Sequence, residues 1–214
     1  MPVIYLLRHG QASYGMEDYD VLSELGRRQA DIAGQELARR GVRSPVVVSG
    51  SLIRQIDTAD IAGKAMNVSP TGIDSRFNEF DAHAAVKTHL GDSAAIQGMP
   101  SKEFQEHLDV VITEWMDSGN SQWQEFSDGA FAALSELAQS LPSGSDAIVA
   151  TSAGVIAVLA GQLLGSDTQG VISMNRVSVN ASITTVVAGS RGLSLVSFND
   201  HAHVMGDRSL LTNR

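Results

Sequence analysis

Residues 3–10 read Val-Ile-Tyr-Leu-Leu-Arg-His-Gly, and this stretch decides the fold. The run Val3–Leu7 is apolar throughout, which is typical of a strand buried on both faces in a parallel sheet. The run ends directly at Arg8 and His9. Because ligands of open α/β sheets bind at the carboxyl ends of the strands, the stretch predicts a buried strand that delivers Arg8 and His9 to a ligand site.

Strand and helix signals alternate along the rest of the chain. Ser23 is a residue of the N-cap type before a helical pattern that Gly41 ends. Two further pairs of a strand and a helix follow, at 45–49 with about 52–65 and at 147–151 with about 154–164. This alternation predicts an α/β fold, with a mostly parallel central sheet between two layers of helices.

The remaining segments predict an edge hairpin and an insertion. Two β-type runs, 181–187 and 193–198, are joined by Gly189-Ser190-Arg191-Gly192, which suits a hairpin turn. About 81–142 contains no convincing strand, but its apolar residues recur at helical spacing, so we expect an inserted helical lid segment. A length of 214 residues fits one domain over 1–214 that carries this insertion.

The composition narrows the class of partner. The formal net charge of −9 argues against nucleic acid, because binding to its phosphate backbone needs a cationic face. The chain has no cysteine, so disulfides and thiol nucleophiles are excluded. No apolar stretch is long enough to cross a bilayer, and the first residues lack the features of a signal peptide. We therefore expect a cytoplasmic protein with no membrane partner.

A second motif follows the next predicted strand. That strand runs into Ser49-Gly50-Ser51-Leu52-Ile53-Arg54, and Thr58-Ala59 lies one helical turn further on. An isolated Arg-His-Gly would be weak evidence for a site. Arg-His-Gly after one strand, combined with the Ser49–Arg54 segment after the next, is a far more specific signal.

At these motifs the chain resembles the histidine phosphatase superfamily, which has the phosphoglycerate-mutase-like fold, and the resemblance extends over most of its length. Beyond the two motifs, the similar segments are Leu22–Ala30, Arg76–Asp81, Asn180–Thr184 and Phe198–His203. The resemblance implies an enzyme of the phosphatase type. We expect it to need no metal, because arginine supplies the positive charge and no cluster of ligands has metal spacing, and we expect no cofactor. Its substrate would be a small phosphorylated molecule or a phosphoprotein.

The resemblance also assigns roles to individual residues. It implies that His9 is the nucleophile, that Arg8 and Arg54 bind the phosphoryl group, and that Glu79 donates a proton to the leaving oxygen. These residue types fit the chemistry, since a neutral imidazole is a good nucleophile and a guanidinium offers fork-like donors to phosphoryl oxygens. Asp81, two residues beyond Glu79, is a further candidate for the acid.

The chain departs from the family pattern after the strand at 147–151. The usual Ser-His-Gly-Gly reads Thr151-Ser152-Ala153-Gly154 here, so Ser152 stands where the family's second phosphate-binding histidine belongs. A hydroxyl donates one hydrogen bond and carries no charge, so we expect a weaker grip on phosphate. Gln11, His201 and His203 are further candidates for the site, the two histidines because either would restore a cation.

Three other functions stay open at this stage. A serine hydrolase would use Ser152 at a degenerate nucleophile elbow, with Asp200 and His203 following in the right chain order. A mutase would move phosphate between two positions of one substrate by the same chemistry. A non-catalytic protein would bind a phosphorylated ligand without turnover. The sequence identifies neither the substrate nor the oligomeric state.

Overall fold

The computed structural model of the chain describes residues 1–13, 20–91, 96 and 98–213. Its centre is a six-stranded sheet in the order β3-β2-β4-β1-β5-β6. The strands are β1 (Val3–Arg8), β2 (Val46–Ser49), β3 (Gly72–Ile73), β4 (Ala147–Thr151), β5 (Ile183–Gly189) and β6 (Gly192–Asp200). Strands β1 to β4 run parallel, whereas β5 and β6 pair antiparallel at one edge. The predicted α/β fold with a mostly parallel sheet and an edge hairpin is therefore confirmed.

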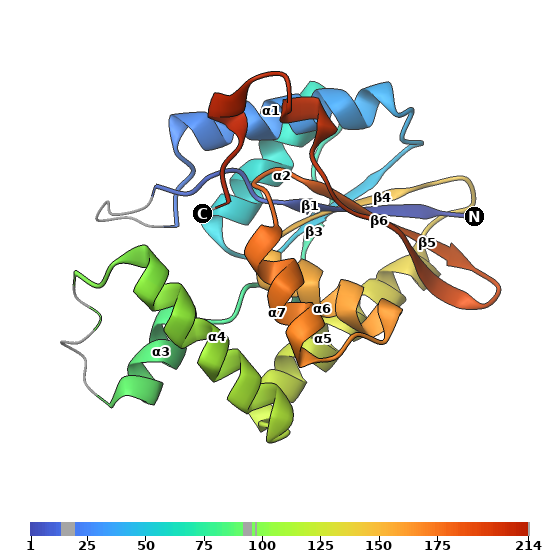
Figure 1. Cartoon of the computed structure of the whole chain (residues 1–214). Coiled ribbons are helices and arrows are strands. Elements are labelled where there is room, and N and C mark those ends of the chain that lie inside the picture. Colours follow the sequence, from blue (N-terminus) through green and yellow to red (C-terminus); the bar gives the residue numbers. More distant parts are fainter. Residues whose placement is uncertain (14–19, 92–95, 97, 214) are drawn as a thin grey trace.

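Helices cover both faces of the sheet (Figure 1). The seven helices within the described residues are α1 (Glu24–Arg39), α2 (Ile53–Ala65), α3 (Ala82–Leu90), α4 (Ser101–Asp117), α5 (Ser121–Ser140), α6 (Ala153–Leu164) and α7 (Thr168–Val177). Helices α1 and α2 pack on one face, and α5 and α6 pack on the other. None of the described helices has the length and apolar character that crossing a bilayer requires.

The apolar run of β1 reflects burial on both faces. Leu6 belongs to the core under α5 and α6, together with Val149 and Ile156. Leu7 points to the opposite face and packs with Leu37 of α1. Because successive side chains of a strand alternate between the two faces, a strand covered on both sides has no polar positions until it ends.

The register of the parallel strands sets the place of the site. Arg8 at the end of β1 lies opposite Thr151 at the end of β4, and Ser49 at the end of β2 lies opposite Ala150. Residues that follow these three strands therefore lie side by side at the carboxyl ends of the parallel strands.

The insertion between β3 and β4 is helical, as its apolar spacing predicts. Helices α3 and α4 extend away from the sheet, and α5 returns to pack on the core (Figure 1). Helix α7 and the two-residue strand β3 are not predicted by the sequence pattern. The first hairpin strand, predicted to begin at Ala181, begins at Ile183 instead, because Ala181 has a left-handed backbone with φ of 56°.

Candidate active site

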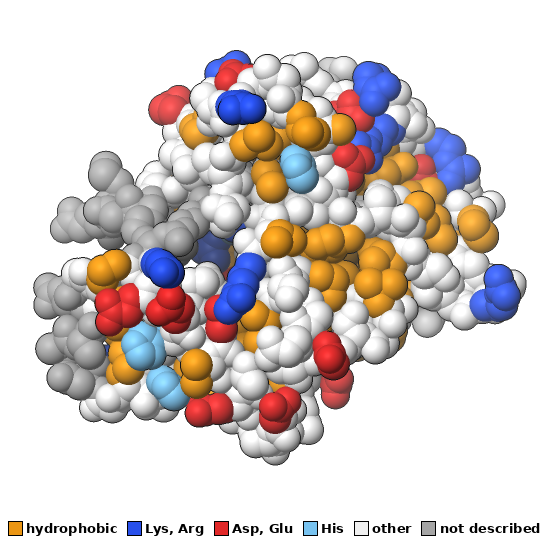
Figure 2. All heavy atoms as spheres, viewed as in Figure 1, with side chains coloured by type: hydrophobic (Ala, Val, Ile, Leu, Met, Phe, Trp, Pro, Cys, Tyr) orange, Lys and Arg blue, Asp and Glu red, His pale blue; other side chains and the backbone are white. Residues whose placement is uncertain are grey.

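Four predicted site residues lie close together at the carboxyl ends of the parallel strands. Arg8 and His9 follow β1, Arg54 lies in the first turn of α2, and Glu79 follows the short 3-10 helix Ser75–Phe77. All four line one cavity of about 470 Å³. Acidic and basic side chains lie intermixed on the face of the molecule seen in Figure 2. The positive charge available to a ligand is thus a local feature of this cavity, within a chain whose net charge is −9.

His9 is held with one ring nitrogen ready to react. Its Nδ1 lies 2.7 Å from the carbonyl oxygen of Gly10, a contact that is a hydrogen bond only if Nδ1 carries the proton. The unprotonated Nε2 then accepts a hydrogen bond from Nε of Arg54 at 3.3 Å. Burial, followed by the charges of Arg8 and Arg54, holds the pKa of His9 well below its ordinary value of 6.5. His9 is therefore neutral near pH 7, as a nucleophile must be.

The backbone around His9 is fixed from several directions. The carbonyl oxygen of His9 accepts hydrogen bonds from Nδ2 of Asn180 at 3.2 Å and from the backbone N–H of Ala181 at 3.3 Å. The N–H of Gly10 donates to Oγ1 of Thr58 at 3.2 Å. A Cβ at Gly10 would lie 2.2 Å from the carbonyl oxygen of Gly26, so only glycine fits after the histidine.

The two arginines are oriented by different partners. Arg8, 6% exposed, donates from Nη1 to the carbonyl oxygen of Ser178 and from Nη2 to that of Asn213 at 3.3 Å. Arg54, 9% exposed, forms an ion pair from Nη1 to Oδ1 of Asp20 at 2.5 Å. The second oxygen of Asp20 accepts the backbone N–H of Ile53, at the start of α2, at 2.8 Å. Asp20 therefore links the guanidinium of Arg54 to the helix that carries it.

Glu79 is docked against the N-terminus of α6. Its Oε2 accepts the backbone N–H of Gly154 at 2.8 Å, and its buried Oε1 has no hydrogen-bond partner among the described residues. A Cβ at Gly154 would lie 2.2 Å from Oε1. Burial raises the pKa of Glu79 above its ordinary value of 4.5, with the Gly154 hydrogen bond and the two arginines opposing the shift. A carboxyl group with a raised pKa keeps its proton longer and suits a general acid.

Comparison with known proteins identifies the family. A family model of the histidine phosphatase superfamily, branch 1, matches residues 4–201. The chain belongs to this superfamily. The resemblance noted in the sequence is therefore confirmed over nearly the whole chain.

The curated proteins that are similar to this chain include a mutase and a protein phosphatase. A 2,3-bisphosphoglycerate-dependent phosphoglycerate mutase of Zymomonas mobilis is 33% identical over 117 residues, which are 50% of this chain and 49% of the mutase. The mitochondrial serine/threonine-protein phosphatase PGAM5 of Xenopus laevis is 41% identical over 63 residues, 28% of this chain and 23% of that phosphatase. The matches thus span half or less of these curated relatives. They support phosphoryl-group chemistry in general.

A solved structure shares the fold over almost the whole chain. A mycobacterial glucosyl-3-phosphoglycerate phosphatase superposes with a TM-score of 0.62 at 22% identity, covering 94% of this chain and 99% of the other. At this identity the likeness concerns the fold alone.

Ser152, which replaces the superfamily's second histidine, does not line the cavity with His9. Its side chain is 1% exposed, and its Oγ accepts a hydrogen bond from Nε2 of Gln55 at 2.8 Å. The same Nε2 also donates to the carbonyl oxygen of Phe77 at 3.0 Å. The expected hydroxyl donor is thus placed below the cavity wall, where Ala153 takes its place as a lining residue.

Of the other candidates, only Asp81 lines the cavity with His9. Its carboxylate caps α3 by accepting the N–H of Ala84 at 2.9 Å. Gln11 accepts a hydrogen bond from Oγ of Ser23 at 3.1 Å, within the loop before α1. His201 and His203 bind the backbone oxygens of Asn199 and Ala181, at 2.6 Å and 3.0 Å, and lie outside the cavity lining.

The elbow of the alternative serine hydrolase is not assembled in this structure. Ser152 contacts Gln55, whereas the carboxylate of Asp200 pairs with Arg40 at 2.7 Å and His203 is bound to Ala181. No hydrogen bond joins Ser152 to a histidine within the described part of the chain. The described residues also contain no group of three or more His, Asp or Glu side chains that could hold a metal ion.

Several residues in or beside the site were not predicted from the sequence. Asp20, which holds Arg54, gave no signal because a single acid in a loop is ordinary. Phe104, Asn175 and Arg176 also line the cavity. Phe104 is one of the apolar residues at helical spacing in the segment about 81–142, a pattern that predicts a helix but no cavity, and the other two residues belong to α7, which the sequence pattern does not predict.

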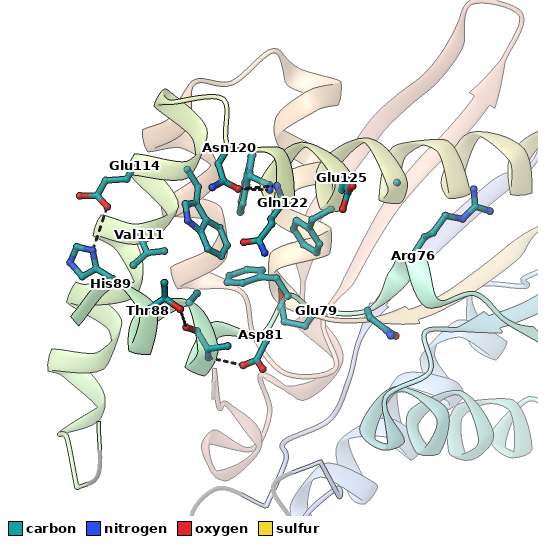
Figure 3. A pocket seen from close by; sticks show the side chains of 18 of the residues that line it. Arg76, Glu79, Asp81, Thr88, His89, Val111, Glu114, Asn120, Gln122 and Glu125 are labelled. Carbon is teal, nitrogen blue, oxygen red and sulfur yellow. Dashed lines mark hydrogen bonds and ion pairs between the residues drawn. The ribbon is translucent and has the colours of Figure 1, made fainter. Parts of the chain in front are cut away.

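A second, larger cavity of about 710 Å³ shares Glu79, Phe80 and Asp81 with the first and is lined neither by His9 nor by the arginines Arg8 and Arg54. Figure 3 looks into this cavity, with Asn120 and Gln122 at the start of α5 and Glu114 on α4. Rings of Phe80, Trp115, Trp123 and Phe126 are part of its wall. The smaller cavity with His9 is the candidate active site, because the reactive groups face it.

Proposed function

We propose that this protein is a phosphomonoesterase that works through a phosphohistidine on His9 and needs no metal. One observation carries the proposal. The unprotonated Nε2 of His9 lies in a cavity beside two arginines and a buried carboxyl group with a raised pKa. The nucleophile, the charge stabilisation and the proton donor of a phosphoryl transfer are therefore present in one place.

In the first step, Nε2 of His9 attacks the phosphorus atom of the ester. An N–P bond forms, the P–O bond to the alcohol breaks, and Glu79 gives its proton to the leaving oxygen. Arg8 and Arg54 donate hydrogen bonds to the phosphoryl oxygens, where negative charge is spread in the transition state. The hydrogen bond from Nε of Arg54 to Nε2 is exchanged for one to the phosphoryl group as the new bond forms.

In the second step, water replaces His9. Glu79, now ionised, takes a proton from a water molecule that attacks the phosphorus atom, and the N–P bond breaks. Inorganic phosphate leaves, His9 returns to its neutral form, and Glu79 is again protonated. Small phosphorylated molecules and phosphoproteins both fit this chemistry, and the names of the relatives include enzymes of both kinds.

Phosphate release from a panel of monoesters, with and without EDTA, tests the proposal. His9→Ala should abolish release without lowering the melting temperature, and the wild type should form an acid-labile phosphoenzyme that His9→Ala lacks. His201→Ala is the matched control, because this histidine lies outside the cavity, and it should retain activity. Full inhibition by EDTA with recovery on adding metal, or activity in His9→Ala, would refute the mechanism.

The superfamily's mutase chemistry is the second candidate, favoured by the Zymomonas mobilis relative. A mutase must retain its substrate while the phosphohistidine is formed. Incubation with 2,3-bisphosphoglycerate and 3-phosphoglycerate separates the two, because a mutase yields 2-phosphoglycerate faster than free phosphate.

A further inference from the structure

The cavity above His9 has walls of two kinds. Its charged end is formed by Arg8, His9, Arg54 and Glu79. The apolar part of the lining comes from several elements: Leu52, Phe80, Ala82, Phe104, Leu108 and Ala153. The other lining residues are polar or charged: Asp81, His83, Gln105, Asn175, Arg176 and Asn213. A phosphoryl group bound at the charged end would therefore direct its alcohol portion toward an apolar wall.

Helix α4 of the insertion supplies Phe104 and Leu108 to this wall. Leu108 is 6% exposed and packs in the core of the insertion, so its position is fixed. The ring of Phe104 is partly exposed and lies 4.9 Å from the ring of His83, at an interplanar angle of 36°. The two rings are tilted against each other and together offer an aromatic surface that an apolar or aromatic group can contact.

The third arginine of the cavity is already neutralised. Arg176 lines the cavity, but its Nε donates to Oδ2 of Asp109 at 2.8 Å and its Nη2 contacts the same oxygen. Asp109 is 7% exposed and also accepts a hydrogen bond from Gln105 at 2.9 Å. A second phosphate or carboxylate on the substrate would have to compete with this buried carboxylate for Arg176.

We infer that the preferred substrates are monoesters whose alcohol portion is apolar and carries no second charge, such as long alkyl or arylmethyl phosphates. The inference rests on the proposed function and concerns the substrate class of the same site. Substrates with two anionic groups, such as phosphoglycerates, are disfavoured because the charged end binds only the phosphoryl group. Elsewhere in the cavity the carboxylate of Asp81 repels a second anion, and Arg176 is already paired with Asp109.

Esters of primary alcohols test the inference, because their leaving groups are similar in basicity. We expect kcat/KM to rise at least on the order of tenfold from ethyl phosphate to hexyl or benzyl phosphate, since apolar groups of this size gain from burial against such a wall. Glycerol 3-phosphate and 3-phosphoglycerate should stay near or below ethyl phosphate. A flat series, or a preference for 3-phosphoglycerate, would overturn the inference while leaving the phosphatase activity intact.

Binding decides the matter even without turnover. Titration calorimetry of the wild type with hexylphosphonate and methylphosphonate, which are not hydrolysed, should give a dissociation constant at least about tenfold lower for the hexyl compound. Equal constants would overturn the inference. Absence of phosphate release from every ester, with hexylphosphonate still preferred, would overturn the proposed function alone.

Two variants of α4 locate the effect. Phe104→Ala should reduce the ratio of kcat/KM for hexyl over ethyl phosphate by at least about threefold, because it removes a ring from the wall. Val110→Ala is the matched control, since Val110 lies on the same helix, is 45% exposed and is outside the cavity lining. An unchanged ratio in Phe104→Ala, or an equal fall in Val110→Ala, would contradict the assigned wall.

Discussion

Among single side chains, Glu79 combines a raised pKa with a position in the lining of the cavity that contains His9. We predict that Glu79→Gln lowers kcat/KM for an alkyl phosphate by on the order of 10²-fold or more, because an alkoxide needs a proton as it leaves. The loss for 4-nitrophenyl phosphate should be less than tenfold, since nitrophenolate leaves without one. Initial rates with the two esters measure the difference.

The neighbouring acid Asp81 is the control for this test. Its carboxylate lines the cavity but caps α3 through Ala84. Asp81→Asn should lower the two rates by the same factor. A selective loss with the alkyl ester in Asp81→Asn, and none in Glu79→Gln, would transfer the role of the acid to Asp81.

Ser152 yields a different expectation from the one its place in the family pattern suggests. Its hydroxyl is buried against Gln55 and absent from the cavity lining, so Ser152→Ala should change kcat by less than about threefold. The free energy of unfolding should fall by about 1 kcal/mol, because Gln55 loses one of its partners. Urea denaturation measures the second effect. Loss of activity by several orders of magnitude would instead support a serine nucleophile.

Among helices and strands, the start of α6 depends on the absence of a side chain. We predict that Gly154→Ala reproduces the selective loss of Glu79→Gln with alkyl esters, on the order of 10²-fold, because the new Cβ would occupy the place of Oε1 and displace the carboxyl group. Kinetics with the same two esters provide the measurement.

Gly129→Ala is the matched control for the α6 variant. Gly129 lies within α5, and the nearest atom to an added Cβ there is 3.9 Å away, on Arg76. This substitution should leave both rates unchanged and favour the helix slightly. Equal behaviour of the two glycine variants would show that Gly154 does not position Glu79.

The elements that could be predicted from the sequence are those with a strong pattern and a clear end. The strand β1, with its buried apolar run ending at Arg8 and His9, is the best example. Helix α7 was missed because its apolar content is reduced to a few buried positions such as Val171 and Ile172. Strand β3 has two exposed residues and owes its pairing to β2. Tertiary context determines such elements.

The site divides along the same line. Arg8 and His9 could be predicted because they directly follow a buried strand. Arg54 and Glu79 were predicted only from the resemblance to a family, because no local pattern indicates that residues 45 and 70 positions after His9 lie beside it in the fold. The burial of Ser152 could not be predicted, because it depends on a hydrogen bond to Gln55, 97 positions away in the sequence.

For the molecule as a whole, the buried His9 couples stability to pH. Its pKa is lowered in the folded state, so between that value and about 6.5 the unfolded chain binds a proton that the folded protein does not. The contribution of His9 to stability is present above this window and is lost as the pH falls through it. The wild type should therefore lose more melting temperature than His9→Gln when the pH is lowered from 7.5 to 5.0. Parallel pH dependences of the two proteins would contradict this.

The contacts of Arg8 and His9 with Ser178, Asn180 and Asn213 also determine when the site can assemble during synthesis of the chain. His9 is made well before its partners, because β1 is flanked in the sheet by β4 and β5, which are made more than 130 residues later. At roughly 5–20 residues per second, synthesis delays these partners by several seconds or more. A nascent chain therefore carries an unassembled candidate site until β4, β5 and Asn213 have been made, and the proposed phosphoryl transfer can begin only after that.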